Sequence, residues 1–176
     1  MMTTLARTLA GPFLAACGLL VVSGLGKVAK PARARVTVTA AGLPFGTAGV
    51  IAVGLAETTV GLVGGVRGGR AALAVAACYL LLMVFAVRLR RRAPNVPCGC
   101  LGNSTTAVTG AHVAFDAAAT AIALIVAFGA SPWAQLAGRR VEVAIFVVLT
   151  ACCARLAALA LEDLPDLAIA TREPAA

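Results

Sequence analysis

Long apolar runs without charge alternate with short polar segments along the chain. No charged side chain falls within residues 8–26, 36–56 or 117–138, and 71–87 is a slightly shorter run of the same kind. Each run approaches the ~20 residues that a helix needs to cross about 30 Å of hydrocarbon. None shows the alternation of apolar and polar positions that is typical of membrane β-barrel strands. The pattern therefore predicts membrane-spanning helices.

The expected fold class is all-α, a polytopic transmembrane helix bundle with four core spans and a fifth after them. The core spans are expected at about 8–26, 43–64, 71–87 and 107–129. The fifth, at 141–161, is interrupted by Glu142 and Arg155, the second of which is close enough to one end to reach the headgroups. Residues 1–130 are expected to form a four-span membrane domain, 131–161 the additional helix, and 162–176 a loose acidic and Pro/Ala-rich tail.

The first apolar run has an alternative interpretation as a cleaved signal peptide. Arg7 precedes it, and Ala32-Arg33-Ala34 loosely resembles a cleavage site. The run is long for a signal, and Lys27 and Lys30 stand between it and that site. These features favour a membrane span.

Composition agrees with a membrane protein. Of 176 residues, 61% are apolar and only 12% are charged, whereas soluble domains have roughly 25% charged residues. Mean hydropathy is +0.97. The formal charge of +8 comes from basic residues beside the apolar runs, so it indicates membrane-flanking charge and not a nucleic-acid partner. The lipid bilayer is the expected environment.

Small residues in the first two runs are expected to let helices approach closely, because lipid removes the hydrophobic drive for helices to associate. The glycines concerned are Gly18, Gly24, Gly49, Gly54 and Gly61.

Two cysteines stand out between the third and fourth spans. Cys98 and Cys100 are separated by Gly99 in the only loop that carries cysteine, and the other four cysteines fall inside apolar runs. Arginines precede the pair, and the amino end of span four, with a cap expected at 104–106, follows it. Positive charge and a helix amino terminus favour the reactive thiolate. A disulfide across one residue closes a strained ring, and strained disulfides tend to be oxidising.

Two other interpretations of this loop stay open. Cys98, Cys100 and His112 could supply three ligands to zinc or copper, although a structural zinc site needs a fourth. The cysteines could also be small apolar residues of a structural turn. Thiol redox chemistry is the leading hypothesis, and no metal site is expected.

Carboxyl groups inside a membrane are costly and usually face a partner or a water-filled cavity. Glu57 in span two is expected about 20 Å below the face that bears the cysteines, and Asp116 in span four about 15 Å below it. Both are candidate catalytic residues on a proton path. The alternative is a structural carboxyl hydrogen-bonded to a neighbouring span.

Three elements together resemble the MauE methylamine-utilisation family over residues 5–130. Pro97-Cys98-Gly99-Cys100-Leu101-Gly102 is similar to its Cys-Gly-Cys-Phe-Gly motif, with Leu101 in place of Phe. Ser23-Gly24-Leu25-Gly26-Lys27 resembles its Ser-Gly-x-x-Lys element, and Glu57 its intramembrane Glu.

The resemblance implies a DoxX-like polytopic protein of a bacterial plasma membrane, laid out like the four-helix thiol oxidoreductases. It implies a thiol/disulfide redox or maturation factor that supports disulfide formation in a secreted client together with a thioredoxin-like protein. A membrane quinone is the cofactor this layout suggests. The alternative is a non-catalytic membrane assembly or transport component with a structural or metal-binding Cys-Gly-Cys loop.

Two arguments about orientation oppose each other. Basic residues are denser on the side of Cys98 and Cys100, counting Lys27 among them, which by the positive-inside rule predicts a cytoplasmic loop. Disulfide chemistry and the family resemblance predict an external loop, because no thiol pool reduces disulfides there. We expect the loop outside.

Overall fold

The computed structural model describes residues 8–94, 96, 107–129, 148, 152 and 156. Its elements are, in chain order, α2 (Ala10–Ala29), α3 (Pro31–Ala40), α4 (Thr47–Arg67), the short 3-10 helix η1 (Gly69–Ala71), α5 (Ala72–Arg92) and α6 (Gly110–Ala127).

Four helices in the described part of the chain are long and apolar enough to cross a membrane. They are Ala10–Ala29, Thr47–Arg67, Gly69–Arg92 and Gly110–Ala127. The prediction of an all-α bundle with four core spans is confirmed. The fifth span expected at 141–161 and the tail at 162–176 lie outside the described residues, apart from three positions of the former.

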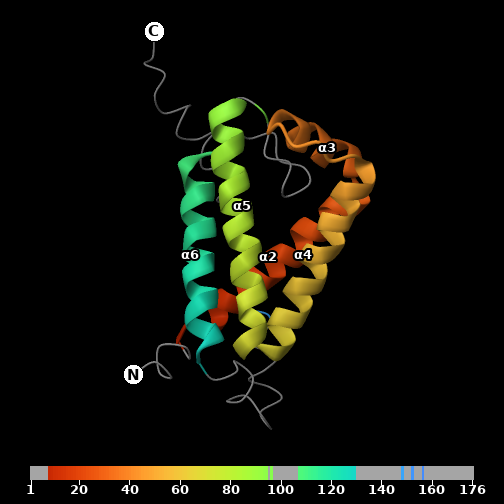
Figure 1. Ribbon diagram of the computed structural model, residues 1–176. Coiled ribbons are helices and arrows are strands. Elements are labelled where there is room, and N and C mark those ends of the chain that lie inside the picture. Colours follow the sequence, from red (N-terminus) through yellow and green to blue (C-terminus); the bar gives the residue numbers. More distant parts are fainter. Residues whose placement is uncertain are drawn as a thin grey trace.

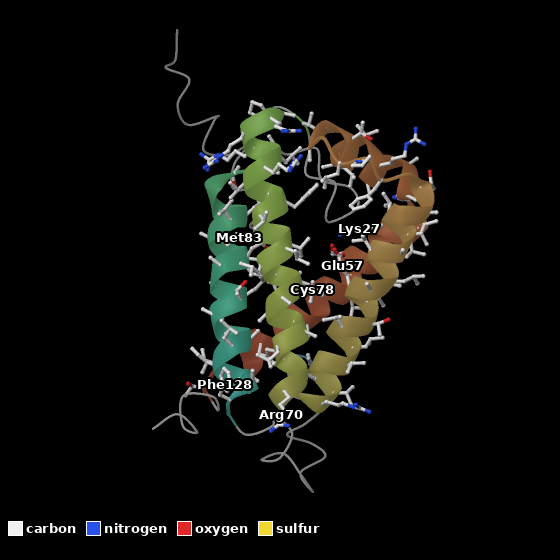
Figure 2. The ribbon with its side chains drawn as sticks, in the orientation of Figure 1. Lys27, Glu57, Arg70, Cys78, Met83 and Phe128 are labelled. Atoms are coloured by element: carbon white, nitrogen blue, oxygen red, sulfur yellow. The ribbon has the colours of Figure 1, made fainter. Side chains whose placement is uncertain are left out.

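The helices form two closely packed pairs. Helix α2 lies against α4, and α5 lies against α6, while α2 also reaches α5 and α6 through its amino-terminal half. Figure 1 shows α3 lying across one end of this arrangement, beside the carboxyl end of α5. We call this the α3 end. The opposite end carries the turn between α4 and α5, where Figure 2 labels Arg70.

Helix α3 corrects the sequence prediction, which left the residues between the first two spans as a loop. Pro31 stands in its first turn, where the missing N–H costs nothing and the fixed φ suits a helix. Its 10 residues rise only about 15 Å, too short to cross a bilayer. The second span consequently begins at Thr47 and ends at Arg67, a few residues later than predicted.

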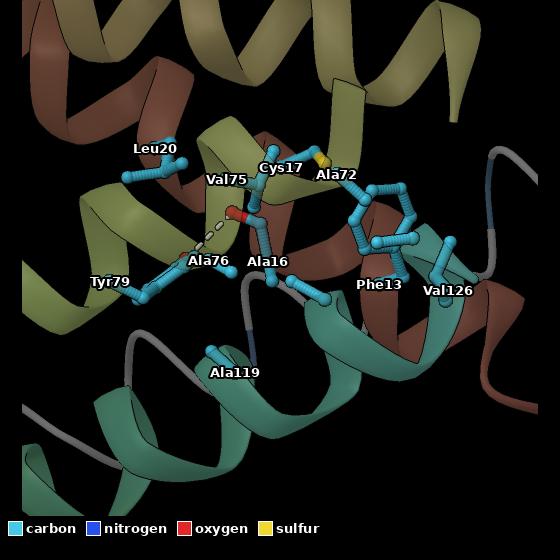
Figure 3. Close-up of a cluster of buried hydrophobic side chains, with 12 residues drawn as sticks. Phe13, Ala16, Cys17, Leu20, Ala72, Val75, Ala76, Tyr79, Ala119 and Val126 are labelled. Carbon is cyan, nitrogen blue, oxygen red and sulfur yellow. Dashed lines mark hydrogen bonds between the residues drawn. The ribbon is translucent and has the colours of Figure 1, made fainter. Parts of the chain in front are cut away.

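The main hydrophobic core joins α2, α5 and α6 (Figure 3). Phe13 and Leu20 of α2, Val75 of α5 and Val126 of α6 are almost fully buried there. Tyr79 of α5 donates a hydrogen bond of 2.7 Å from its hydroxyl to the Ala16 carbonyl, and its ring meets Phe115 edge to face at 6.0 Å. The buried hydroxyl thereby has a hydrogen-bond partner within the protein, as an apolar surrounding requires.

Glycines set the contact between α2 and α4. A Cβ on Gly54 would lie 2.7 Å from the Gly24 carbonyl oxygen, and one on Gly61 would lie 2.7 Å from that of Cys17. A Cβ on Gly24 would meet Gly54 and Thr58. The predicted packing role is confirmed for these three glycines and is wrong for Gly18, which has open space beside it. At Gly49 the three atoms nearest to an added Cβ all belong to Phe45, which lies just before the same helix.

The outward faces of the spans are apolar. Leu55, Leu62, Leu81 and Val84 are each at least half exposed, with Leu81 at 69%. Leucine at such positions is costly in water and favourable in lipid tails. The exposed apolar surface therefore agrees with a bundle whose solvent is the bilayer.

Candidate functional site

An ion pair is buried between the first two spans. Lys27 of α2 places its Nζ 2.6 Å from Oε2 of Glu57 on α4. The two residues are only 8% and 4% exposed. Each charge alone would be expensive in this apolar setting, so each requires the other.

Ser23 completes the site. Its Oγ accepts a hydrogen bond of 2.6 Å from Lys27 Nζ and donates one of 3.2 Å to Glu57 Oε2. All three side chains are buried, and in the described part of the chain no fully buried side-chain nitrogen or oxygen lacks a partner. We call Ser23, Lys27 and Glu57 the polar triad. Figure 2 shows Lys27 and Glu57 together between the helices.

Local spacing explains how the helices assemble the triad. Ser23 and Lys27 are four residues apart on α2, so they lie on the same face one turn apart. Glu57 stands between Gly54 and Gly61 on the buried face of α4, three residues after the first and four before the second. Because the glycines bring the two backbones into contact, the carboxylate reaches the ammonium directly.

The structure corrects the interpretation of Lys27. From the sequence, Lys27 was predicted to be a membrane-flanking charge at the end of the first span, but α2 continues through Lys27 to Ala29. The lysine can be buried because it pairs with Glu57 of α4, which is 30 residues further along the chain. The one-turn spacing of Ser23 and Lys27 beside an intramembrane Glu is the sequence signal that would have revealed it.

Asp116 does not join the triad. It is half-buried on α6, interacts electrostatically with Lys27, and makes no side-chain hydrogen bond that involves Glu57. Its backbone carbonyl accepts a bond of 2.7 Å from Thr120 Oγ1. The hydrogen bonds that hold the triad together therefore join Ser23, Lys27 and Glu57 and do not include Asp116.

Cys78 is a free cysteine of α5 that sequence reasoning placed among apolar residues. It is half-buried and interacts electrostatically with both Glu57 and Lys27. Figure 2 labels it on the helix that faces the triad. Cys78 is therefore the one thiol that α5 carries.

His112 lies in the first turn of α6. Its Nδ1 accepts a hydrogen bond of 3.3 Å from the Thr109 backbone N–H and lies 3.0 Å from Thr109 Oγ1. Thr109 is the residue that precedes the helix, so the cap expected at 104–106 is instead formed here. This capping interaction occupies one of the two ring nitrogens, and the metal-binding interpretation needs only the other.

Cys98 and Cys100 lie outside the described residues, within the segment 97–106 that connects the end of α5 to the start of α6. Both of those helix ends are at the α3 end of the bundle (Figure 1). Among the described residues, no group of three potential metal ligands occurs.

These features define a multi-pass membrane protein in which a buried ion pair joins the first two spans. The chain belongs to the MauE family: the family model described as "Methylamine utilisation protein MauE" matches residues 5–129. This range includes all four observed spans, the polar triad and the Cys98-Gly99-Cys100 segment. No curated protein and no solved structure matches the chain.

Proposed function

We propose that this protein is a thiol/disulfide redox or maturation factor that supports disulfide formation in a partner protein. Cys98 and Cys100 are the reacting residues. The partner is a secreted client reached directly or through a thioredoxin-like protein, and the membrane is the bacterial plasma membrane.

One observation carries the proposal. The two closely spaced cysteines fall within the family-matched region, in the connection between α5 and α6. Arg90, Arg91 and Arg92 are exposed in the last turn of α5, immediately before that connection. Guanidinium charge stabilises a thiolate, which is both the attacking and the leaving form in disulfide exchange.

The reaction balances as a two-electron exchange. A thiolate of the client attacks the Cys98–Cys100 disulfide, which breaks the S–S bond and forms a mixed disulfide. The second client thiolate resolves it, leaving the client oxidised and both cysteines reduced. Two electrons and two protons then pass to a membrane quinone, which becomes the quinol and restores the Cys98–Cys100 disulfide.

Glu57 and Asp116 are the candidate proton carriers for the quinone step. The two carboxyls lie within the spans, and Lys27 interacts with both. Because Glu57 is ion-paired, taking up a proton there would break its attraction to Lys27. Asp116 forms no ion pair with any described residue, so taking up a proton there breaks none.

Serine replacements test the proposal. Cys98→Ser and Cys100→Ser should each abolish oxidation of the client, because serine is nearly isosteric but cannot form a disulfide. We expect Cys98→Ser to accumulate a mixed disulfide through Cys100, which is nearer the amino end of α6. Trapping by alkylation followed by mass spectrometry would detect it. Cys152→Ser serves as the control, since Cys152 is a free cysteine far along the chain.

Normal client maturation in both serine variants would contradict the proposal. Dependence of activity on added zinc or copper, with sensitivity to chelators, would contradict it as well. Either result would favour a membrane assembly or transport component whose Cys-Gly-Cys segment is structural or binds metal.

A further inference from the structure

Basic side chains from two separate elements gather at the α3 end. Seven exposed basic residues contribute. Three lie in or just before α3, and four lie in the last turns of α5: Lys30, Arg33 and Arg35, and Arg88, Arg90, Arg91 and Arg92. Figure 2 shows side-chain nitrogens (blue) grouped at this end. At the opposite end the described residues include only Arg67 and Arg70 as bases.

Arg88 fixes the two basic elements to each other. Its Nε donates a hydrogen bond of 2.8 Å to the Ala41 carbonyl, and its guanidinium makes a longer bond of 3.4 Å to that of Gly42. Gly42 has φ of 72°, a conformation that glycine adopts readily and that turns the chain after α3. The Arg92 guanidinium also lies against Gly42. The arginines of α3 and α5 thus belong to one built surface.

No carboxyl among the described residues lies at the α3 end. The described carboxyls are Glu57 and Asp116, and both lie inside membrane-spanning helices. Arg35, Arg90 and Arg91 form no ion pair with any described residue. Their charges are available to an anionic partner.

Apolar side chains at the same end indicate what that partner is. Val36 of α3 is 65% exposed, and Phe45 in the following turn is 46% exposed. The ends of four spans mark this level as the membrane interface. A short helix with exposed apolar and basic side chains at that level suits lipid acyl chains and headgroups better than the surface of a soluble acidic protein.

We propose that α3 and the carboxyl end of α5 form a binding surface for anionic phospholipid headgroups. The guanidinium groups of Arg35, Arg90 and Arg91 contact the lipid phosphates, and Val36 and Phe45 enter the upper acyl region. The surface goes beyond the proposed redox function and does not depend on it, although Arg90 and Arg91 also belong to the arginines that precede Cys98 and Cys100.

Native mass spectrometry of the full chain tests this proposal. The purified protein, in mild detergent, is given equal amounts of phosphatidylglycerol and phosphatidylcholine. We expect retained phosphatidylglycerol to predominate. The variant Arg90→Gln/Arg91→Gln should lose that preference about tenfold, and Arg35→Gln, from the other element, should lose it severalfold. Arg67→Gln/Arg70→Gln, with the same charge change at the opposite end, should retain it.

Several outcomes would overturn the proposal. Equal loss in both double variants, or no preference in the wild-type protein, would show that the α3 end is not the site. Stronger retention of a polyglutamate peptide than of phosphatidylglycerol would assign the surface to an acidic protein. If the α3-end variants fail to fold, a salt titration of the wild-type protein decides: the preference should largely disappear near 1 M salt, where the Debye length is about 3 Å.

Discussion

Lys27 and Glu57 come from different helices, 30 residues apart in the chain, and their charged atoms are 2.6 Å apart inside the membrane-spanning part of the bundle. The two sequence elements that resembled the family separately are therefore parts of one structural site. Ser23 links them, and the glycine contact between α2 and α4 makes the approach possible.

The ion pair should behave as a coupled unit in stability. Lys27→Met or Glu57→Leu alone leaves one buried charge without its partner and should cost about 3–5 kcal/mol. The double variant should recover most of that loss, because it leaves no charge in the apolar contact. Thermal unfolding of the protein in detergent measures the three values. Additive losses in the double variant would show that the two residues stabilise the fold independently.

A second pair of variants separates stability from proton exchange. Lys27→Gln/Glu57→Gln removes both charges, keeps hydrogen-bonding groups, and should fold and insert. If Glu57 carries a proton to the quinone, client oxidation should fall at least tenfold in this double variant. Asp116→Asn is the parallel test on α6. Full activity in the folded Gln/Gln variant would leave Glu57 a purely structural role.

The close contact of α2 and α4 should not tolerate larger side chains. Gly54→Val adds a Cβ 2.7 Å from the Gly24 carbonyl oxygen and should destabilise the bundle by about 1–3 kcal/mol, since backbone must move to admit it. Gly18→Ala, with open space around the new Cβ, is the control and should be neutral or stabilising by up to about 1 kcal/mol. Urea or thermal unfolding compares them. Equal effects of the two substitutions would contradict the contact.

Arg88 should hold α3 in place. Arg88→Met keeps much of the apolar stem but removes the donors to Ala41 and Gly42, at a cost of about 1–3 kcal/mol. Amide hydrogen exchange in 31–41 should then become faster, while exchange in α6 is unchanged. Arg91→Met, three residues further on and without a hydrogen bond to α3, is the matched control. Unchanged protection of α3 in Arg88→Met would show that other contacts hold this helix.

The orientation of the bundle can be measured directly. If the loop of Cys98 and Cys100 faces outward, a membrane-impermeant maleimide added to intact, reduced cells should label it. The Cys98→Ser/Cys100→Ser variant should lose that labelling. Labelling that requires permeabilised cells would place the α3 end in the cytoplasm, as the density of basic residues there predicts.

The linear sequence was sufficient to predict the spans. Whether a run of about 20 residues enters lipid depends on the summed transfer free energy of its own side chains. Four charge-poor runs therefore predicted four spanning helices, whose observed ends lie within a few residues of the predicted ones. The same reasoning identified Glu57 as exceptional, because a carboxyl in such a run is costly wherever it lies. It also identified Cys98 and Cys100, whose structural setting lies outside the described residues and whose role stays a prediction.

Only the tertiary structure decided which groups meet. Lys27 looked like flanking charge because a lysine at the end of an apolar run normally reaches the headgroups, and α3 looked like a loop because its residues are too polar for a span. Both outcomes depend on partners distant in the chain: Glu57 on α4 for the lysine, and Arg88 on α5 for the turn after α3. Transfer into lipid is a local property of a segment. An ion pair between two helices forms only if the helices bring the two side chains to the same level, and here it also needs the close backbone contact that the glycines allow.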